Sequence, residues 1–182
     1  MNSSDYYTAK EIKKLGFKKV GKNLQIKKSA KFFFCKNIVI GNNVRIEDYS
    51  IITGRGKLTI GDYVQISSRC LLGKFGIDLG NYVTVAPGVK IFSASDDYYG
   101  NEIYTSFLKD NNFLEKNRGK VKIGDYVIIG ANSVVMPNLN IEEGVAIGAL
   151  SFVNKSLKKW YIYYGNKITR GKKRSKKFLK KL

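Results

Sequence analysis

Two adjacent carboxylates, Asp96 and Asp97, stand directly before a pair of tyrosines, Tyr98 and Tyr99, in a chain of 182 residues. Neighbouring carboxylates can orient a nucleophile, accept a proton from it, or raise one another's pKa. Histidine, the usual general base near neutral pH, does not occur anywhere in the sequence. The paired aspartates are therefore the first candidates for acid–base chemistry, and the alternative is a polar turn without a catalytic role.

Positive charge gathers at the C-terminus. The formal net charge is +19, and residues 167–182 contain nine lysines and arginines without one acid. Such a tail can attract anionic lipid, nucleic acid or a phosphate-bearing ligand, or it can simply be a solvated terminus. Nucleic acid is not expected as a partner, because no base-stacking aromatic residues are interleaved with the charges.

The cysteine and histidine content argues against a metal site. Cys35 and Cys70 are isolated, which indicates neither a disulfide framework nor a zinc site, and a zinc site of three histidines, such as γ-class carbonic anhydrases need, is excluded. The N-terminus has no apolar segment of a signal peptide, and no run approaches the roughly 18 apolar residues of a membrane span. A cytoplasmic protein without a metal is expected.

A six-residue repeat indicates which secondary structure must position the candidate residues. Aliphatic residues recur six apart, and a second aliphatic or small residue follows four positions later. The first series is Val20, Ile26, Phe32; Ile40, Ile46, Ile52; Ile60, Ile66, Leu72; Leu79, Val85, Ile91; and Ile123, Ile129, Val135, Ile141, Ile147, Val153. The second series is Val44, Ser50, Val64, Cys70, Val83, Val89, Val127, Ser133, Val145 and Ser151.

A period of six fits neither an α-helix nor a single strand. It predicts an all-β solenoid, a parallel β-helix with three flat faces and about 18 residues per turn, in which each turn buries its core against its neighbours. Turns starting at residues 20, 40, 60, 79, 123 and 141 give six in total. An ordinary antiparallel β domain is the alternative.

The sequence predicts three regions. Residues 1–19 form a capping helix, because Thr8 and Glu11 have the spacing of a capping box. Residues 20–158 form the β-helix, interrupted by one long loop at 96–122. Residues 159–182 form a C-terminal segment and basic tail, which is expected to be a short helix.

The hexads resemble those of the left-handed β-helix hexapeptide-repeat acetyltransferases of bacterial surface-sugar biosynthesis. The resemblance is carried by the repeat, by the segments 129–135 and 147–153 with their Gly-Ala pairs, by the loop opening at Ser95, and by the aromatic segment 160–166. It covers nearly the whole chain. It is strongest toward sugar O-acetyltransferases and the acyltransferases that act on dTDP-4-amino-4,6-dideoxyglucose.

The resemblance implies a homotrimer with acetyl-CoA, the acyl donor, extended along a groove between neighbouring helices. The residues implied to lie beside the cofactor are Gly130, Ala131, Gly148 and Ala149, with Lys155 and Arg170 as candidates for its phosphates. The chain departs from the family pattern where Lys167-Ile168 replaces Pro-Ala after Gly165-Asn166, and where Ile128 replaces an aromatic residue. Both departures fall where the adenine end of the cofactor is expected.

Many members of this family use a loop histidine as base, and Asp96 takes its position here, with Asp97 beside it. For a hydroxyl acceptor, a carboxylate with a pKa near ~4 is a weak base unless burial or its neighbour raises that pKa. An amine with a pKa of roughly 8 is about a tenth neutral at pH 7 and needs no prior deprotonation. The second explanation is favoured, with Asp96 and Asp97 orienting the amine and accepting its proton, and Tyr98 and Tyr99 contacting the sugar.

The function expected from the sequence is acetyl transfer to the amine of a nucleotide-linked amino-dideoxy sugar, for O-antigen or capsule synthesis. Transfer to a sugar hydroxyl is the alternative, and a non-catalytic β-helix scaffold is the alternative from another class. Because surface-glycan precursors are assembled at the inner membrane face, the basic tail is a candidate for contact with that membrane.

Overall fold

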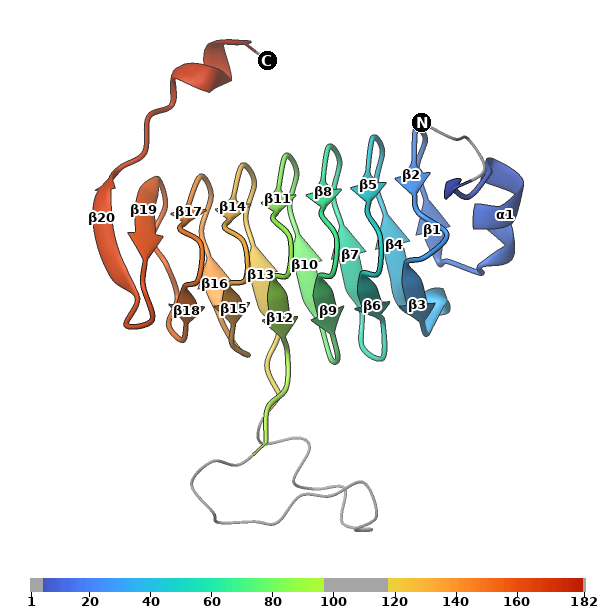
Figure 1. Cartoon of the computed structure of the whole chain (residues 1–182), viewed down its shortest axis with the longest axis horizontal. Coiled ribbons are helices and arrows are strands. Elements are labelled where there is room, and N and C mark those ends of the chain that lie inside the picture. Colours follow the sequence, from blue (N-terminus) through green and yellow to red (C-terminus); the bar gives the residue numbers. More distant parts are fainter. Residues whose placement is uncertain (1–4, 97–117, 182) are drawn as a thin grey trace.

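The chain folds into an elongated parallel β-helix, in which short strands stack side by side along one axis (Figure 1). The computed structural model describes residues 5–96 and 118–181. Its strands form three sheets, which we call faces 1, 2 and 3 in the order in which each turn visits them. The corners between them are named accordingly, so that corner 1–2 leads from face 1 to face 2.

Face 1 contains six strands: β1 (Lys19–Val20), β4 (Ile38–Ile40), β7 (Leu58–Ile60), β10 (Ile77–Leu79), β13 (Val121–Ile123) and β16 (Asn140–Ile141). Face 2 contains eight: β2 (Gln25–Ile26), β5 (Arg45–Ile46), β8 (Gln65–Ile66), β11 (Thr84–Val85), β14 (Ile128–Ile129), β17 (Ala146–Ile147), β19 (Tyr161–Tyr164) and β20 (Thr169–Lys173). Face 3 contains six: β3 (Lys31–Phe33), β6 (Ile51–Thr53), β9 (Leu71–Gly73), β12 (Lys90–Phe92), β15 (Val134–Val135) and β18 (Phe152–Val153). The predicted β-helix of six turns is confirmed.

The core consists of the predicted aliphatic ladders. On face 2, for example, Val85 pairs with Ile66 on one side and with Ile129 on the other, and all three side chains are fully buried. The second series of the repeat, four positions after each ladder residue, is buried as well, including the polar Ser50 and Ser133. Each buried aliphatic side chain contributes about 1.5–3 kcal/mol relative to an exposed one, so stacked ladders supply the main stabilising term.

Corner 1–2 is tight because successive turns bring their backbones into contact there. A Cβ atom on Gly61 would lie 2.5 Å from the carbonyl oxygen of Gly80, so only glycine fits. The next residue in each turn hydrogen-bonds to its neighbour: the Asn42 amide donates to Asp62 Oδ1 (2.7 Å), and the Asp62 amide donates to Asn81 Oδ1 (2.9 Å). These bonds satisfy amide groups that the corner takes out of the sheets.

A short helix, α1 (Ala9–Lys14), lies at the N-terminal end of the stack (Figure 1). The predicted capping box is present: the Thr8 amide donates to Glu11 Oε2 (2.7 Å) and the Glu11 amide donates to Thr8 Oγ1 (3.2 Å). Ile12 is buried against the first turn. A 3₁₀ turn, η2 (Cys35–Asn37), takes up the extra residues of an early corner. Among the residues that the structure describes, no helix is long and apolar enough to cross a membrane.

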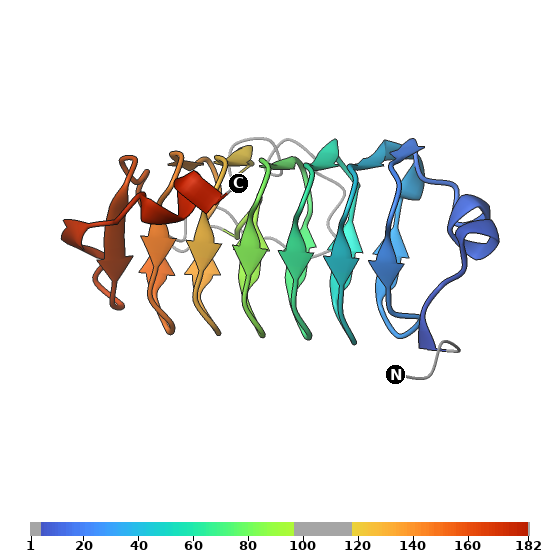
Figure 2. The ribbon, with the colours of Figure 1, turned by 90° about the horizontal axis from the view of Figure 1, so that it is seen from above.

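The C-terminal segment differs from the expected short helix. Parallel pairing continues beyond residue 158, because β19 adds to β17 with Tyr163 opposite Ile147. β20 then pairs antiparallel with β19, since an open sheet edge gains hydrogen bonds from a further strand. Only η3 (Lys177–Lys181) is helical, as a 3₁₀ turn. The tail turns back over the later turns of the stack (Figures 1 and 2).

The predicted loop 96–122 interrupts the stack at corner 3–1, between β12 and β13 (Figure 1). It ends earlier than expected, because β13 already begins at Val121. The register is unaffected by the insertion: Ile77 pairs with Leu58 on one side and Val121 on the other. Asp97, Tyr98 and Tyr99 lie outside the described residues.

Candidate active site

Asp96 lies on the chain segment that leaves β12, which we call the outgoing limb (residues 93–96). The returning limb (residues 118–120) runs beside it. Ala94 and Arg118 form an antiparallel bridge between the limbs, and the Gly119 amide donates to the carbonyl oxygen of Ser93 (3.1 Å). Asp96 is exposed to solvent. The bridge and the hydrogen bond hold the limb that carries Asp96 against the returning limb.

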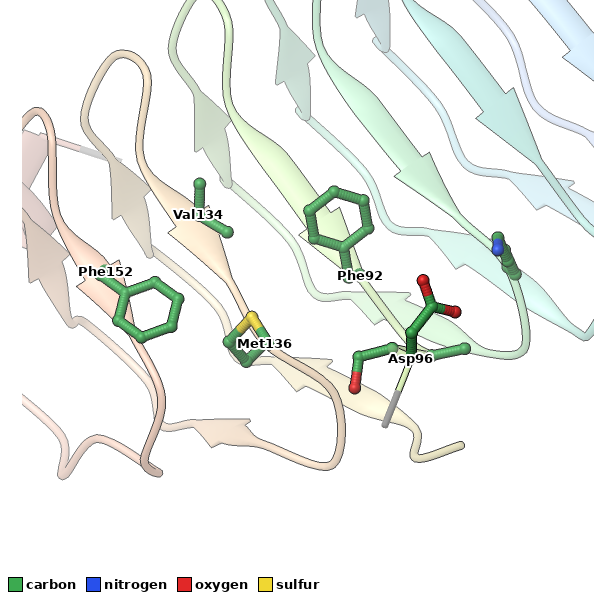
Figure 3. Close-up of a pocket in the computed structure, with 8 residues that line it drawn as sticks. Phe92, Asp96, Val134, Met136 and Phe152 are labelled. Atoms are coloured by element: carbon green, nitrogen blue, oxygen red, sulfur yellow. The ribbon is translucent and has the colours of Figure 1, made fainter. Parts of the chain in front are cut away.

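The Asp96 carboxylate faces a pocket of about 500 Å³ (Figure 3). Its wall consists of outward-facing side chains of face 3, and its rim consists of the outgoing limb and the turn after β9. The lining residues are Lys74, Phe92, Ala94, Ser95, Asp96, Val134, Met136 and Phe152. One carboxylate and one ammonium thus share a mainly apolar pocket, which suits a ligand with an apolar part beside a polar or charged one.

The apolar wall distinguishes face 3 from the other two faces. Outward positions on face 1 include Asp78 and Lys122, and those on face 2 include Arg45 and Gln65. The corresponding outward positions on face 3 are more apolar: they include Ile51, Leu71, Val134 and Phe152. Lys90 stands between Leu71 and Val134 in this ladder, so the apolar residues form two stretches, one on either side of it. Exposed apolar patches of this kind mark a site that a ligand or another protein chain covers.

The two Gly-Ala pairs lie at corner 2–3 and lead into β15 and β18, the strands that supply Val134 and Phe152 to the pocket wall. Gly130 is required by packing alone, because a Cβ atom there would lie 2.6 Å from the carbonyl carbon of Gly148. Ala149 is exposed and Ala131 half-buried. None of the four lines the pocket, but the corner that carries them borders its wall.

The two residues proposed to bind the phosphates of the cofactor, Lys155 and Arg170, belong to different elements. Lys155 is exposed on the segment that follows β18. Arg170 is exposed in β20, where its guanidinium stacks over the Tyr161 ring at 4.8 Å from the ring centre. Lys158, three residues after Lys155, forms an ion pair with Glu142 (Nζ to Oε1, 3.0 Å).

The basic tail beyond β20 is held on corner 1–2, not on the corner of the Gly-Ala pairs. Arg174 Nη1 donates to the carbonyl oxygens of Tyr126 (2.5 Å), Gly144 (3.1 Å) and Val145 (3.4 Å). Burial lowers the pKa of the Arg174 guanidinium, and these carbonyls compensate for its lost hydration. This part of the tail is therefore separated from the expected cofactor groove of the same chain.

An aromatic stack supports the tail at the same corner. The rings of Tyr63, Tyr82 and Tyr126 stack with centre distances of 4.8 and 5.1 Å. Gly144 supplies no side chain in the next turn, and Trp160 fills the space above it. Phe178 of the tail then packs on Tyr126 and Trp160, at 5.9 and 6.1 Å.

Residues 120–155 match the family model described as bacterial transferase hexapeptide (six repeats). A dTDP-4-amino-4,6-dideoxy-D-glucose acyltransferase from Escherichia coli is 36% identical to the chain over 171 residues, covering 93% of this chain and 88% of that protein. The chain belongs to the hexapeptide-repeat acyltransferases.

Solved structures of AntD, an N-acyltransferase from Bacillus cereus, are similar over nearly the full length of this acyltransferase chain. A serine-to-alanine variant of AntD, in complex with dTDP-4-amino-4,6-dideoxyglucose and coenzyme A, is 39% identical with a TM-score of 0.89, covering 99% of this chain and 95% of that one. AntD in complex with dTDP and 3-hydroxybutyryl-CoA is 38% identical with a TM-score of 0.87, covering 97% and 93%.

Of the residues that line the pocket of this acyltransferase, sequence reasoning had proposed only Asp96. Phe92, Val134 and Phe152 carry a recognisable signal, because each is apolar at an outward hexad position where a polar residue is expected. No sequence signal marks Lys74, because it is one of 33 lysines and arginines and lies in a turn outside the six-residue repeat.

Proposed function

We propose that the protein transfers an acyl group from acyl-CoA to the amine of a nucleotide-linked amino-dideoxy sugar. The observation that carries the proposal is the Asp96 carboxylate at the rim of an apolar pocket on face 3. The apolar wall suits the deoxygenated carbons of such a sugar, and the carboxylate suits its amine. AntD, whose structures contain dTDP-4-amino-4,6-dideoxyglucose and coenzyme A, supports the same chemistry.

We propose that the acyl donor binds along the corner beside the pocket. Ala131 and Ala149 leave the backbone of corner 2–3 accessible, which suits the narrow amide-bearing arm of coenzyme A. Bound acyl-CoA supplies a thioester carbonyl that is activated toward nucleophiles. We keep acetyl as the proposed acyl group, and a four-carbon acyl group is the alternative, because AntD was solved with 3-hydroxybutyryl-CoA.

The reaction requires little of the protein beyond orientation and proton transfer. The neutral amine attacks the thioester carbonyl, the C–N bond forms, and the C–S bond breaks as the coenzyme A thiol leaves. Asp96 hydrogen-bonds the amine, directs its lone pair, and accepts the proton that the nitrogen loses, which then passes to the thiolate. The Lys74 ammonium can bind a phosphate or carbonyl oxygen at the same rim.

The exposure of Asp96 favours an amine over a hydroxyl. A hydroxyl acceptor needs a strong base, whereas an amine with a pKa of roughly 8 is already about a tenth neutral at pH 7. The AntD structures include variants at one serine and at one aspartate, ten positions apart in that chain. An aspartate chosen for replacement in that enzyme supports a functional carboxylate in this one, and Asp96 is our candidate for it.

The proposal is tested with purified protein, acetyl-CoA and dTDP-4-amino-4,6-dideoxyglucose, following release of free thiol, with butyryl-CoA as the second donor. dTDP-6-deoxyglucose, which carries a hydroxyl in place of the amine, is the matched acceptor. Asp96→Asn should lower kcat/KM for the amine about 10²-fold or more. Asp5→Asn, an exposed carboxylate in the N-terminal region, should leave it unchanged. Thiol release with the hydroxyl sugar alone would refute the proposal.

We further propose that the enzyme is a homotrimer that covers the apolar surface of face 3. Phe33, Phe34 and Ile51 expose 52%, 53% and 39% of their areas there, beyond the reach of the pocket. A second copy of the chain would bury these residues and close the pocket. Light scattering after size exclusion should give about three times the chain mass of 20.5 kDa. Ile51→Glu should shift the mass toward one chain.

The tail supports a third proposal, contact with the inner membrane face during synthesis of O-antigen or capsule precursors. Lys172, Lys173, Lys177 and Lys180 are exposed, while Arg174 and Phe178 fix the tail to the helix. Such a strip attracts anionic lipid by about 1 kcal/mol per charge near the surface. Binding to vesicles that contain phosphatidylglycerol should fall steeply with salt and weaken strongly when residues 175–182, which include Lys177 and Lys180, are deleted. Equal binding to neutral vesicles would contradict it.

A further inference from the structure

Ser93, the first residue of the outgoing limb, is completely buried although it is polar. Its hydroxyl oxygen accepts hydrogen bonds from the backbone amides of Lys74 (2.8 Å) and Phe75 (2.6 Å). Its own amide donates to the carbonyl oxygen of Gly73 (3.0 Å). Its carbonyl oxygen accepts from the Gly119 amide (3.1 Å). Ser93 therefore connects the turn after β9, the outgoing limb and the returning limb.

These three segments meet around the two charged groups of the pocket. Lys74 belongs to the turn that Ser93 binds through its hydroxyl, and Asp96 follows Ser93 by three residues on the outgoing limb. Lys74 and Asp96 lie on successive turns of the β-helix. The Ser93 hydroxyl hydrogen-bonds directly from one turn to the other at the rim, so it connects the backbone that carries Lys74 to the backbone that carries Asp96.

Arg118 reinforces the same junction from the returning limb. Its guanidinium carbon lies 3.7 Å from the centre of the Phe75 ring, and its backbone pairs with Ala94. Lys120, two residues further on, forms an ion pair with Asp78. The cation–π contact between Arg118 and Phe75 thus attaches the returning limb to the turn that carries Lys74.

We propose that Ser93 is a positioning residue for acyl transfer, which fixes Asp96 and Lys74 relative to each other across the pocket. The inference rests on the proposed function. Because reacting groups must be aligned closely, a displacement of about 1 Å can lower the rate about 10²-fold. Loss of the Ser93 hydroxyl leaves two amides without an acceptor, and the turn that carries Lys74 then shifts to find new partners.

The chain offers a matched control in Ser50. Ser50 is also completely buried, and its hydroxyl oxygen accepts from the Cys70 amide (3.2 Å) while it donates to the Ser67 carbonyl oxygen (2.8 Å). It lies at corner 2–3 of an early turn and contributes nothing to the pocket lining. Ser50→Ala and Ser93→Ala therefore remove comparable buried hydroxyls, and only the second disturbs the rim.

The test measures thermal stability, kcat/KM for the amino sugar and KM for acyl-CoA in both variants, and repeats Ser93→Ala in an Asp96→Asn background. We expect both variants to lose similar stability. Only Ser93→Ala should lower kcat/KM for the amino sugar, about 10- to 100-fold, with KM for acyl-CoA unchanged. In the Asp96→Asn background, Ser93→Ala should have less than a threefold further effect, because residues that act as one unit are not additive.

Equal kcat/KM in Ser93→Ala and Ser50→Ala, or a fully additive loss in the double variant, would overturn the inference. If Ser93→Ala does not fold, Arg118→Gln loosens the same junction from the returning limb and enters the same double-variant comparison. Failure of the proposed function is a separate outcome, since the unaltered protein would then transfer no acyl group to the amino sugar.

Discussion

Replacing Arg174 by alanine should release the basic tail from the β-helix while removing only one of its positive charges. Arg174 Nη1 carries two hydrogens, so it makes two good bonds at a time among the carbonyl oxygens of Tyr126, Gly144 and Val145. Hydrogen bonds to a charged group contribute about 1.5–3 kcal/mol each when buried, and Arg174 is only half-buried. We therefore expect its replacement to weaken tail docking by about 2–3 kcal/mol.

A change of this size raises the population of detached tails by about 30- to 150-fold, because every 1.4 kcal/mol corresponds to a factor of ten. Brief trypsin digestion under native conditions measures that population when re-docking is faster than cleavage. Cleavage after Lys176 and Lys177, followed by mass spectrometry, should accelerate accordingly. The rest of the β-helix should stay intact, since detachment of a terminal segment is a local opening.

Lys172→Ala is the matched control, because it removes the same charge from an exposed position in β20. Its tail should be cut at the rate of the unaltered protein. The reasoning is refuted if Arg174→Ala and Lys172→Ala are cut at rates within about threefold of each other, because the three carbonyl contacts would then contribute little to docking.

Three further predictions concern parts away from the tail. Hydrogen bonds from Thr8 lower the pKa of Glu11 to about 2. The stabilising effect of the Glu11 carboxylate on α1 should therefore be full above pH 4.5 and disappear as the pH falls toward 2. An NMR titration of Glu11 checks this, and Thr8→Ala should raise the midpoint of that titration. Burial raises the pKa of the Cys70 thiol to about 11 and also raises that of Cys35, so a disulfide reagent at pH 8 should modify the native protein slowly, Cys35 before Cys70, and both rapidly after denaturation. Gly130→Ala should lower the unfolding free energy by about 1–3 kcal/mol through overpacking against Gly148, and Gly148→Ala, whose nearest neighbour is Tyr164 Cβ at 3.1 Å, should lower it less in denaturant titrations.

The aliphatic ladders could be predicted because each turn repeats one local rule. Ile66 and Val85 pair with each other because both occupy the same position of the six-residue repeat, and that position is visible in each repeat by itself. The capping box of Thr8 and Glu11 was predictable on the same ground, because both partners lie within one helical turn. Asp96 could be proposed because it stands where the repeat is interrupted, at the position of the family's loop histidine.

The C-terminal segment could not be predicted in this way. Tyr163 continues the face 2 ladder as an aromatic residue in an aliphatic position, so the period was lost from view there. Arg174 binds the carbonyl of Tyr126, which is 48 residues away in the chain. Ser93 is likewise explained only by the amide groups of Lys74 and Phe75, which approach it because neighbouring turns stack. Contacts of this kind depend on the assembled helix and have no local signature.

The unbroken register on either side of the insertion means that the pairing of the strands does not depend on the inserted segment. Ile77 pairs with Val121 as though the turns were consecutive, so the ladders do not record what lies between Asp96 and Arg118. A segment at this corner can lengthen, shorten or change in composition without moving one core residue. A designer can therefore exchange the segment between Asp96 and Arg118 and leave the paired strands of the β-helix as they are.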